Sequence, residues 1–387
     1  MKIIRGYKTE IAPNNKQTTA LIQHAGVARF AYNWGLIEKK KAFDAKTKIP
    51  NAIELHRRLN ALKPTNFPWM YNSSKCSPQE ALRNLDRAFD NFFRKCKQKK
   101  AGKKGFPRFK SKKKGIGSFR FTGKIKVYNN HIKLPVLGNL KLKERKYLPL
   151  DAKILSATVS EKAGRWYVSI QVEEDAIPFN GNKDQHSIIG VDLGIKTLLV
   201  CSDGQKFENP KVLKRNLKKV KRFQRAISRK VKGSGKRKKA VKKFSVLYSH
   251  ISNIRKDNLH KITTHLTKTK SIIGIEDLNI SGMMKNHKLA QSIQDLGLYE
   301  WRRQLEYKGK LYNCKIVPVD RFFPSSKKCN ICGVLNEELT LSDRVWTCAC
   351  GAVHDRDENS SKNLEKVAAS STETINAHEG RLPLPAA

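Results

Sequence analysis

Four cysteines in the C-terminal part of the chain restrict how this part can fold. Two residues separate Cys329 from Cys332, and one separates Cys348 from Cys350. Thiolates that converge from two tight turns are typical ligands of one tetrahedral Zn²⁺. The remaining cysteines are scattered along the chain: Cys76, Cys96, Cys201 and Cys314. We therefore expect residues 326–352 to form a zinc ribbon, whose metal is structural because four protein ligands leave no open coordination position.

Acidic residues at the ends of apolar segments give a second constraint. The stretch "SIIGVDLGIKTLLVCSDGQKFE" (187–208) predicts three strands joined by tight turns, with Asp192 at the end of the first. A further short strand is predicted in "SIIGIEDLNISG" (271–282), with Glu276 at its end and Asp277 beside it as a competing candidate. Asp355 and Asp357 start the predicted final helix, where the alternative role of each is to cap that helix.

The order of these elements is that of a ribonuclease-H-like fold. Three strands, a long helical segment (211–269), a strand, a helix, a strand and a final helix follow one another. In this fold the first and fourth strands are neighbours, which would bring Asp192 and Glu276 together. Converging carboxylates repel one another, and divalent cations relieve the repulsion. Mg²⁺ or Mn²⁺ suits such oxygen ligands, and two ions can hold both oxygens of a phosphodiester, so we expect metal-assisted hydrolysis of nucleic acid.

The N-terminal half predicts a different architecture. Residues 1–10 alternate like a strand, residues 11–104 are mostly helical with a proline-rich break at 62–72, and short alternating segments follow to about 182. Ser77 is expected to cap the helix that follows the break. We expect a small antiparallel barrel or sandwich with the helices inserted between its strands. Residues 178–186 resemble a linker, and the tail from 371 has no packing pattern.

The charge of the chain indicates a polyanionic partner. The sequence has 79 Lys and Arg against 33 Asp and Glu, a net charge of +46, which opposes compaction unless a polyanion neutralises it. Two basic segments are candidates for phosphate contact, although such runs are often only solvated surface. Their candidate residues are Arg108, Lys110, Lys112, Lys113, Lys218, Lys219, Arg222 and Arg225. No apolar run reaches membrane-span length and the start lacks a signal-peptide core, so we expect a cytoplasmic protein that binds no membrane.

Several motifs resemble one known family. They are "GVDLGIKTL", "GIEDLNISGMMKNHKLA", "WRRQLEYKGKLY", "VDRFFPSSKKCNICG" and "WTCACGAVHDRDEN". In combination they resemble the TnpB (OrfB) family of IS200/IS605-type transposons, which is related to the Cas12 nucleases. The resemblance implies an RNA-guided DNA endonuclease with a RuvC-like domain. In such an enzyme a guide RNA (ωRNA) pairs with one strand of target double-stranded DNA beside a short adjacent motif, and the protein acts as a monomer on its RNA in a prokaryotic cell, associated with the nucleoid when bound to DNA.

The resemblance also implies an α/β fold with several domains and indicates where each domain begins and ends. A wedge β-barrel would comprise 1–10 and 105–182, a helical recognition domain 11–104, and the nuclease domain 186–325 and 353–370. The zinc ribbon (326–352) would be inserted in the nuclease domain, and 371–387 would be a disordered tail.

Carried over by motif, the catalytic and metal-binding acids are Asp192, Glu276 and the aspartate of "D-x-N", Asp357, with Asp355 as fallback. The family pattern "D-x-N-A-A-x-N-I" reads "DENSSKNL" here, so Ser360 and Ser361 replace two alanines. Three other functions are weighed against guided cleavage: an RNA-guided repressor that has lost cleavage, an accessory transposase, and a compact Cas12-type CRISPR effector. The presence of all three acids favours the nuclease over the repressor.

Overall fold

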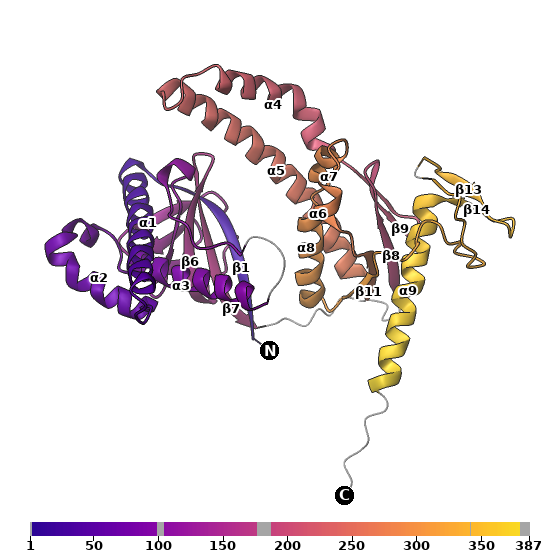
Figure 1. Cartoon of the computed structure of the whole chain (residues 1–387), viewed down its shortest axis with the longest axis horizontal. Helices are drawn as coiled ribbons and strands as arrows, with labels where there is room; N and C mark the ends of the chain where they lie inside the picture. The colour runs from indigo at the N-terminus through magenta and orange to yellow at the C-terminus, as the bar shows by residue number, and fades with distance from the viewer. Residues whose placement is uncertain (1, 99–103, 176–186, 341, 380–387) are drawn as a thin grey trace, which may run out of the picture. The chain divides into compact units, whose positions relative to one another are not determined.

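A computed structural model describes residues 2–98, 104–175, 187–340 and 342–379 of the chain (Figure 1). The chain divides into two compact units, residues 1–176 and 177–387. The predicted linker at 178–186 lies outside the described residues. Within the described part, no helix combines the length and the apolar character that a membrane crossing needs.

The first unit combines one antiparallel sheet with a set of helices. Its strands are β1 (Lys2–Ala12), β2 (Ser118–Phe121), β3 (Lys126–Val127), β4 (His131–Leu134), β5 (Gly138–Leu142), β6 (Lys153–Lys162) and β7 (Arg165–Asp175). They form a seven-stranded sheet in the order β2-β6-β7-β1-β5-β4-β3. Because β1 pairs with both β5 and β7, the helical segment is inserted between strands of one sheet, as the sequence predicts. Closure of this sheet into a barrel stays a prediction.

Helices of the first unit share one hydrophobic core with that sheet. They are α1 (Asn15–Asp44), α2 (Ala52–Asn66) and α3 (Cys76–Lys97), with short 3₁₀ turns η1 (Pro68–Asn72) and η2 (Lys112–Lys114). Leu82 and Leu85 of α3 and Phe121 of β2 are fully buried in this core. The basic loop after α3 is held on α1, since Asn33 exchanges two hydrogen bonds of 2.8 and 2.9 Å with the backbone of Lys110.

Two local predictions in this unit are wrong. The expected break at 62–72 starts too early, because α2 continues through Pro64 to Asn66. Ser77 does not cap α3, which begins at Cys76; its buried hydroxyl has no hydrogen-bond partner. Glu80, the third residue after Ser77 and so the position that would complete a capping box with it, pairs with Arg83 at 2.7 Å.

The second unit contains a five-stranded sheet that carries the predicted acids. Its strands are β8 (Ile188–Leu193), β9 (Thr197–Cys201), β10 (Lys206–Glu208), β11 (Ile272–Glu276) and β12 (Lys315–Val319), in the order β10-β9-β8-β11-β12. The strand β11 lies parallel to both β8 and β12. The first and fourth strands of this unit are therefore neighbours, as predicted.

Helices connect and cover this sheet. They are α4 (Val212–Ser228), α5 (Gly235–Thr269), α6 (Ile280–Met283), α7 (Ala290–Leu296), α8 (Leu298–Leu311) and α9 (Arg356–Glu379). The helices α4 and α5 form a hairpin (Figure 1). The single helix expected over 289–313 is split into α7 and α8, because Gly297 has a φ of +72°. The expected disordered tail from 371 is wrong as far as Glu379, where α9 ends; residues 380–387 lie outside the described part.

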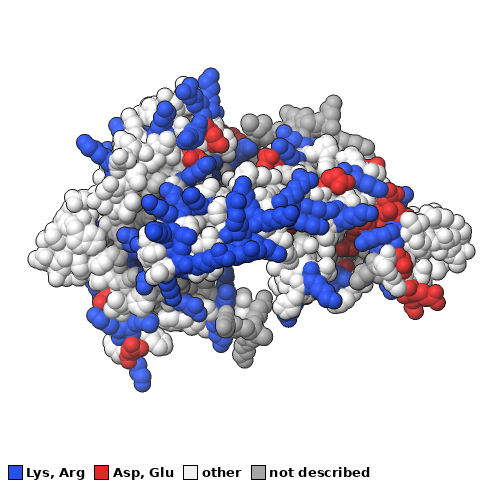
Figure 2. Space-filling view, turned by 90° about the horizontal axis from the view of Figure 1, so that it is seen from above, with Lys and Arg blue, Asp and Glu red and all other residues white. Residues whose placement is uncertain are grey.

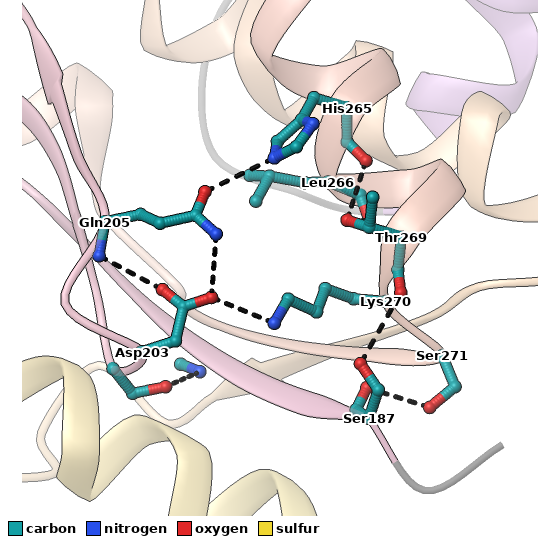
Figure 3. Close-up of polar contacts among 10 residues, drawn as sticks. Ser187, Asp203, Gln205, His265, Leu266, Thr269, Lys270 and Ser271 are labelled. Carbon is teal, nitrogen blue, oxygen red and sulfur yellow. Dashed lines mark hydrogen bonds and ion pairs between the residues drawn. The ribbon is translucent and has the colours of Figure 1, made fainter. Parts of the chain in front are cut away.

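A polar network joins the end of α5 to the sheet (Figure 3). Lys270 forms an ion pair of 2.9 Å with Asp203 in the turn between β9 and β10. Gln205 donates to the same carboxylate over 3.1 Å and lies 3.3 Å from a ring nitrogen of His265. Ser271 donates to the carbonyl of Ser187 over 2.8 Å. These contacts fix the starts of β8 and β11 side by side, and so set the register at their far ends.

Candidate active site and metal-binding cluster

Asp192 and Glu276 lie at the same end of two neighbouring parallel strands. Val191 of β8 is paired in register with Ile275 of β11, and the two acids follow these residues. In-register neighbours on parallel strands direct their side chains to the same face of a sheet. The predicted pair of carboxylates is thus brought to one site.

The last helix, α9, crosses this sheet at very short range. Gly190 and Gly274 are paired in the same register. A Cβ atom on Gly190 would overlap the carbonyl oxygen of Ser361, and one on Gly274 would lie 2.5 Å from that of Leu364. Glycine at both positions lets the backbone of α9 rest directly on β8 and β11, as Figure 1 shows for α9 and β8. The first turn of α9 consequently lies beside the two carboxylates.

Electrostatics links Asp192 to acids from two other elements. Burial, together with the negative charges of Glu276 and Asp357, raises the pKa of Asp192 to about 8, against a hydrogen bond from Ser360 that lowers it. That hydroxyl, on α9, donates to Oδ1 of Asp192 over 2.9 Å. Carboxylate oxygens are the ligands that divalent cations such as Mg²⁺ prefer, so the chemistry of these residues fits such an ion.

The two competing acids have other partners. Asp277 is paired with the guanidinium groups of both Arg302 and Arg321, and hydrogen bonds from the two arginines lower its pKa. The neighbouring Glu276 instead accepts a hydrogen bond of 2.6 Å from Ser325. Of these two neighbouring acids, Glu276 is the one whose charge raises the pKa of Asp192.

Asp355 caps the final helix. Its Oδ1 accepts the backbone N–H groups of Asp357 and Glu358 over 3.0 and 3.1 Å, which is the bonding pattern of a helix N-cap. Asp357 is the acid that acts on Asp192, and its Oδ1 lies 3.4 Å from the guanidinium of Arg344, an exposed residue. The geometry therefore gives the capping role to Asp355.

The four predicted cysteines converge. Their Sγ atoms all lie within 4.8 Å of one another, with 3.8 Å between Cys329 and Cys350 and 3.5 Å between Cys332 and Cys348. Tetrahedral Zn²⁺ with bonds of about 2.3 Å requires sulfur atoms about 3.8 Å apart, so the cluster fits this ion. The second knuckle joins β13 (Val345–Thr347) to β14 (Val353–Asp355).

This zinc-ribbon-like cluster is tied to α9. Asn359 and Asn363, both buried on α9, donate to the carbonyl of Lys328 over 2.8 and 2.6 Å. Lys328 directly precedes Cys329. The buried ring of His354 lies 3.1 Å from the sulfur of Cys329. The cluster therefore helps to fix α9, and with it Asp357.

Sequence reasoning missed four residues of the site: Ser325, His354, Asn359 and Asn363. Each is polar and each touches a predicted ligand or its neighbour through a contact that spans at least 25 positions. In the sequence these residues are marked only by their position within the motifs "FPSSKKC" and "HDRDENSSKN". That position does not show which residue each of them contacts.

All eight predicted nucleic-acid-binding residues are exposed. The ammonium of Lys110 lies 4.0 Å from the centre of the Tyr32 ring, so this lysine also helps to hold its own loop on α1. Residues 211–243, mostly in α4 and the start of α5, contain seventeen Lys and Arg and no acid, and among the described residues none of these cations forms an ion pair. Figure 2 shows Lys and Arg side chains gathered across the face seen from above, the side on which α4 lies in Figure 1.

Family models match three parts of the chain. Residues 157–287 match a model described as a probable transposase of the OrfB/IS605 type, residues 299–364 match the Cas12f1-like TNB domain, and residues 1–48 match a helix-turn-helix domain of OrfB/IS605 proteins. A Streptomyces pristinaespiralis protein named "Putative RNA-guided DNA endonuclease" is 35% identical over 94% of this chain and 89% of its own length. The chain belongs to the TnpB (OrfB) family.

Other relatives agree with this TnpB assignment. The Escherichia coli K12 protein "Putative RNA-guided DNA endonuclease InsQ" is 33% identical over 94% of this chain and 92% of its own length. A Cas12f1 chain, solved by cryo-EM in complex with sgRNA and target DNA, shares the fold with a TM-score of 0.58 at 15% identity, covering 94% of this chain and 99% of that one. In this TnpB protein, residues 1–48 form the strand β1 and the helix α1, so they are not a helix-turn-helix.

Proposed function

We propose that this TnpB-family protein is an RNA-guided DNA endonuclease that cuts double-stranded target DNA by metal-dependent hydrolysis. The proposal is supported by the in-register ends of β8 and β11, which carry Asp192 and Glu276, and by the charges of Glu276 and of Asp357 on α9, which act on Asp192. The second unit would then be a ribonuclease-H-like (RuvC) nuclease domain, since its sheet has the strand order of that fold. The names of the relatives support guided DNA cleavage as its activity.

The three carboxylates would hold Mg²⁺ or Mn²⁺. When bound, such ions supply Lewis-acid stabilisation of the attacking and leaving oxygens of a phosphodiester. The chain's own residues prepare this site. Ser360 donates a hydrogen bond to one carboxylate oxygen of Asp192, and Ser325 donates one to a carboxylate oxygen of Glu276. The second oxygen of each carboxylate would then bind a cation. Structural Zn²⁺ in the cysteine cluster would fix α9 and thereby the position of Asp357.

Guide RNA and target DNA would bind the basic surfaces. The unpaired cations of residues 211–243 on the α4–α5 hairpin, and the basic loop with Arg108, Lys112 and Lys113, offer phosphate contacts without acidic competitors nearby in sequence. Binding through such contacts is strongly salt-dependent, and base pairing with the guide supplies the sequence specificity. We further propose that the first unit comprises the wedge and recognition domains, and that one protein molecule binds one RNA in the cytoplasm.

Purification from cells that express the native locus tests this function. We expect a short transcript to co-purify, and the complex to cut DNA that matches the transcript's end in the presence of Mg²⁺. Asp192→Ala should abolish cleavage and keep RNA and DNA binding. A protein that binds RNA and matching DNA but never cuts would instead be the guided repressor.

A further inference from the structure

A cavity of about 350 Å³ lies directly beside the proposed nuclease site. Glu276, one of the three proposed metal ligands, forms part of its wall. Its size is within the range of small-molecule binding sites, roughly 300–1,000 Å³. Its other walls come from the loop after β11, from α6, from the loop after β12 and from α9. The residues that matter below are Leu278, Met283, Phe322, Phe323 and Leu364.

Phe322, in the wall of this cavity, is 86% exposed, more than any other large apolar side chain in the described part of the chain. Its exposure does not come from a loose loop. The backbone N–H of Phe322 donates to Oδ1 of Asp320 over 2.8 Å, and that of Phe323 donates to the carbonyl of Asp320 over 3.1 Å. The same turn supplies Ser325, which holds Glu276. An aromatic ring is thus presented to solvent by a turn that also positions a proposed metal ligand.

The chemistry of the walls selects a neutral, planar group. Glu276 and Asp320 line the cavity and disfavour a phosphate or another anion, and the cation in the wall, Arg321, is already paired with Asp277. The charge of Asp277 is balanced by Arg302 and Arg321. Leu278, Met283, Phe323 and Leu364 supply apolar surface. Among the parts of a nucleic acid, a base is uncharged and has an aromatic face. The phosphate of the same nucleotide would bind at the neighbouring cation site proposed above.

We propose that this cavity binds one unstacked nucleobase of the DNA strand that is being cut, with the ring of Phe322 stacked on the base. The proposal rests on the nuclease function proposed above and adds to it a subsite that holds the scissile phosphate in register with the carboxylates. Stacking of a base on an aromatic side chain is worth about 1–3 kcal/mol and tolerates any base, so the subsite positions the strand without reading its sequence.

Single-turnover cleavage by the RNA-loaded protein tests the proposal. Targets carry one abasic residue at successive positions on either side of the cut. With wild-type protein we expect one position at which the abasic residue slows cleavage, roughly 5- to 150-fold from the stacking energy. Phe322→Ala should slow cleavage of the intact target by a similar factor and add no further loss at that position, whereas Phe322→Trp should retain the wild-type rate.

Tyr299→Ala is the matched control. Tyr299 on α8 is also an exposed aromatic residue, at 74%, and does not line the cavity. This variant should cut the intact target within about twofold of the wild-type rate and should keep the full loss at the sensitive abasic position. The proposal is wrong if, at every position, the reductions of the cleavage rate caused by Phe322→Ala and by the abasic residue combine as independent factors. It is also wrong if Phe322→Ala cuts the intact target at the wild-type rate.

A binding measurement separates this proposal from the function on which it rests. Single-stranded DNA with 2-aminopurine at one position is added to the RNA-loaded protein in buffer without Mg²⁺ or Mn²⁺ and without a chelator that would remove the zinc, where no cleavage is expected. Stacking on Phe322 should quench the fluorescence, and Phe322→Ala should abolish the quenching. Quenching in a protein that never cuts DNA would overturn the nuclease and keep the base-binding site. Equal fluorescence with wild type and Phe322→Ala at every labelled position would overturn the base-binding site alone.

Discussion

The hydroxyl of Ser360 donates a hydrogen bond of 2.9 Å to Oδ1 of Asp192, across 168 positions of sequence. The bond exists because α9 lies flat on β8 and β11, where two glycines leave room for its backbone. In the family pattern an alanine takes the place of Ser360. Here the serine is almost fully buried and makes a direct contact with a proposed metal ligand. The position of α9 on the sheet thus decides the geometry of the acidic site.

Gly190→Ala tests the importance of this close packing. The new methyl group would overlap the carbonyl oxygen of Ser361, so α9 must move away from β8. We expect the variant to lose about 3 kcal/mol of unfolding free energy and most of its cleavage activity. Urea unfolding and single-turnover cleavage provide the two measurements. Gly235→Ala is the control, because a Cβ atom there meets nothing within 4 Å, and it should change stability by less than about 0.5 kcal/mol.

Asp295 caps a helix from a distant part of the chain. Its carboxylate accepts the N–H of Leu213 at 2.9 and 3.1 Å, while Lys211, at the N-cap position of α4, has a φ of +44° and gives no side-chain cap. Asp295→Ala should cost about 1–2 kcal/mol and speed hydrogen exchange in the first turn of α4. Asp257→Ala, which removes an exposed pair with Lys261 on α5, should cost less than about 0.5 kcal/mol. Equal exchange in both variants would contradict the capping role.

Loss of one cysteine ligand should affect the acidic site indirectly. We expect the wild-type protein to contain one Zn²⁺ per chain by elemental analysis. Cys332→Ser should lower the zinc content, the thermal midpoint and the cleavage rate together, because the bonds from Asn359 and Asn363 to Lys328 link the cluster to α9. Cys96→Ser, at a cysteine outside the cluster, should leave all three unchanged. A fully active protein without zinc would refute this account of the cluster.

We expect Lys308 to make the free energy of unfolding increase with pH in the alkaline range. This buried lysine donates to the carbonyl of His260 and to the hydroxyls of Thr263 and Thr264. Burial, with a contribution from Arg303, lowers its pKa from 10.5 to about 8. Between pH 8 and 10.5 the unfolded chain binds more protons at this residue than the folded one, so its contribution to unfolding free energy rises with pH and levels off above this range.

Comparison with Lys308→Met isolates this contribution. From pH 8 to 10.5 the unfolding free energy of the wild type should rise relative to that of the variant by an amount on the order of 2 kcal/mol. Urea unfolding of both proteins across this range measures the difference. A constant difference would mean that Lys308 keeps its ordinary pKa in the folded protein.

The strands and the cysteine pairs that carry the proposed site can be predicted from the sequence, because each is encoded by a short continuous segment. An apolar run that ends in an acid identifies β8 with Asp192 and β11 with Glu276, and the spacing of the four cysteines predicts that they converge, as they do. The contacts that complete the site are not local. Ser325, Ser360 and Asn363 gain their roles only through partners 34 or more positions away, and no periodicity encodes a partner.

The errors along the chain have equally specific causes. Ser77 has the residue type of a cap, but α3 begins two residues earlier than such a cap implies, at Cys76, and the hydroxyl is buried. Gly297 lies inside an otherwise helical pattern, where a left-handed residue ends α7 and starts α8. At Ser77 the packing of the surrounding elements outweighs the local preference of the residue. At Gly297 the freedom of glycine to adopt a positive φ outweighs the helical pattern around it.

Side-by-side cleavage assays of Asp357→Asn and Asp355→Asn test the central claim most directly. The claim is that Asp357, together with Asp192 and Glu276, holds the catalytic cations, while Asp355 only caps α9. Asparagine is a good N-cap, so Asp355→Asn should fold and cut at nearly the wild-type rate. Asp357→Asn should bind guide and target normally but cut at least about 1,000-fold more slowly, as expected when a metal ligand is lost. Rapid cutting by Asp357→Asn and loss of cutting in Asp355→Asn would contradict the proposed site.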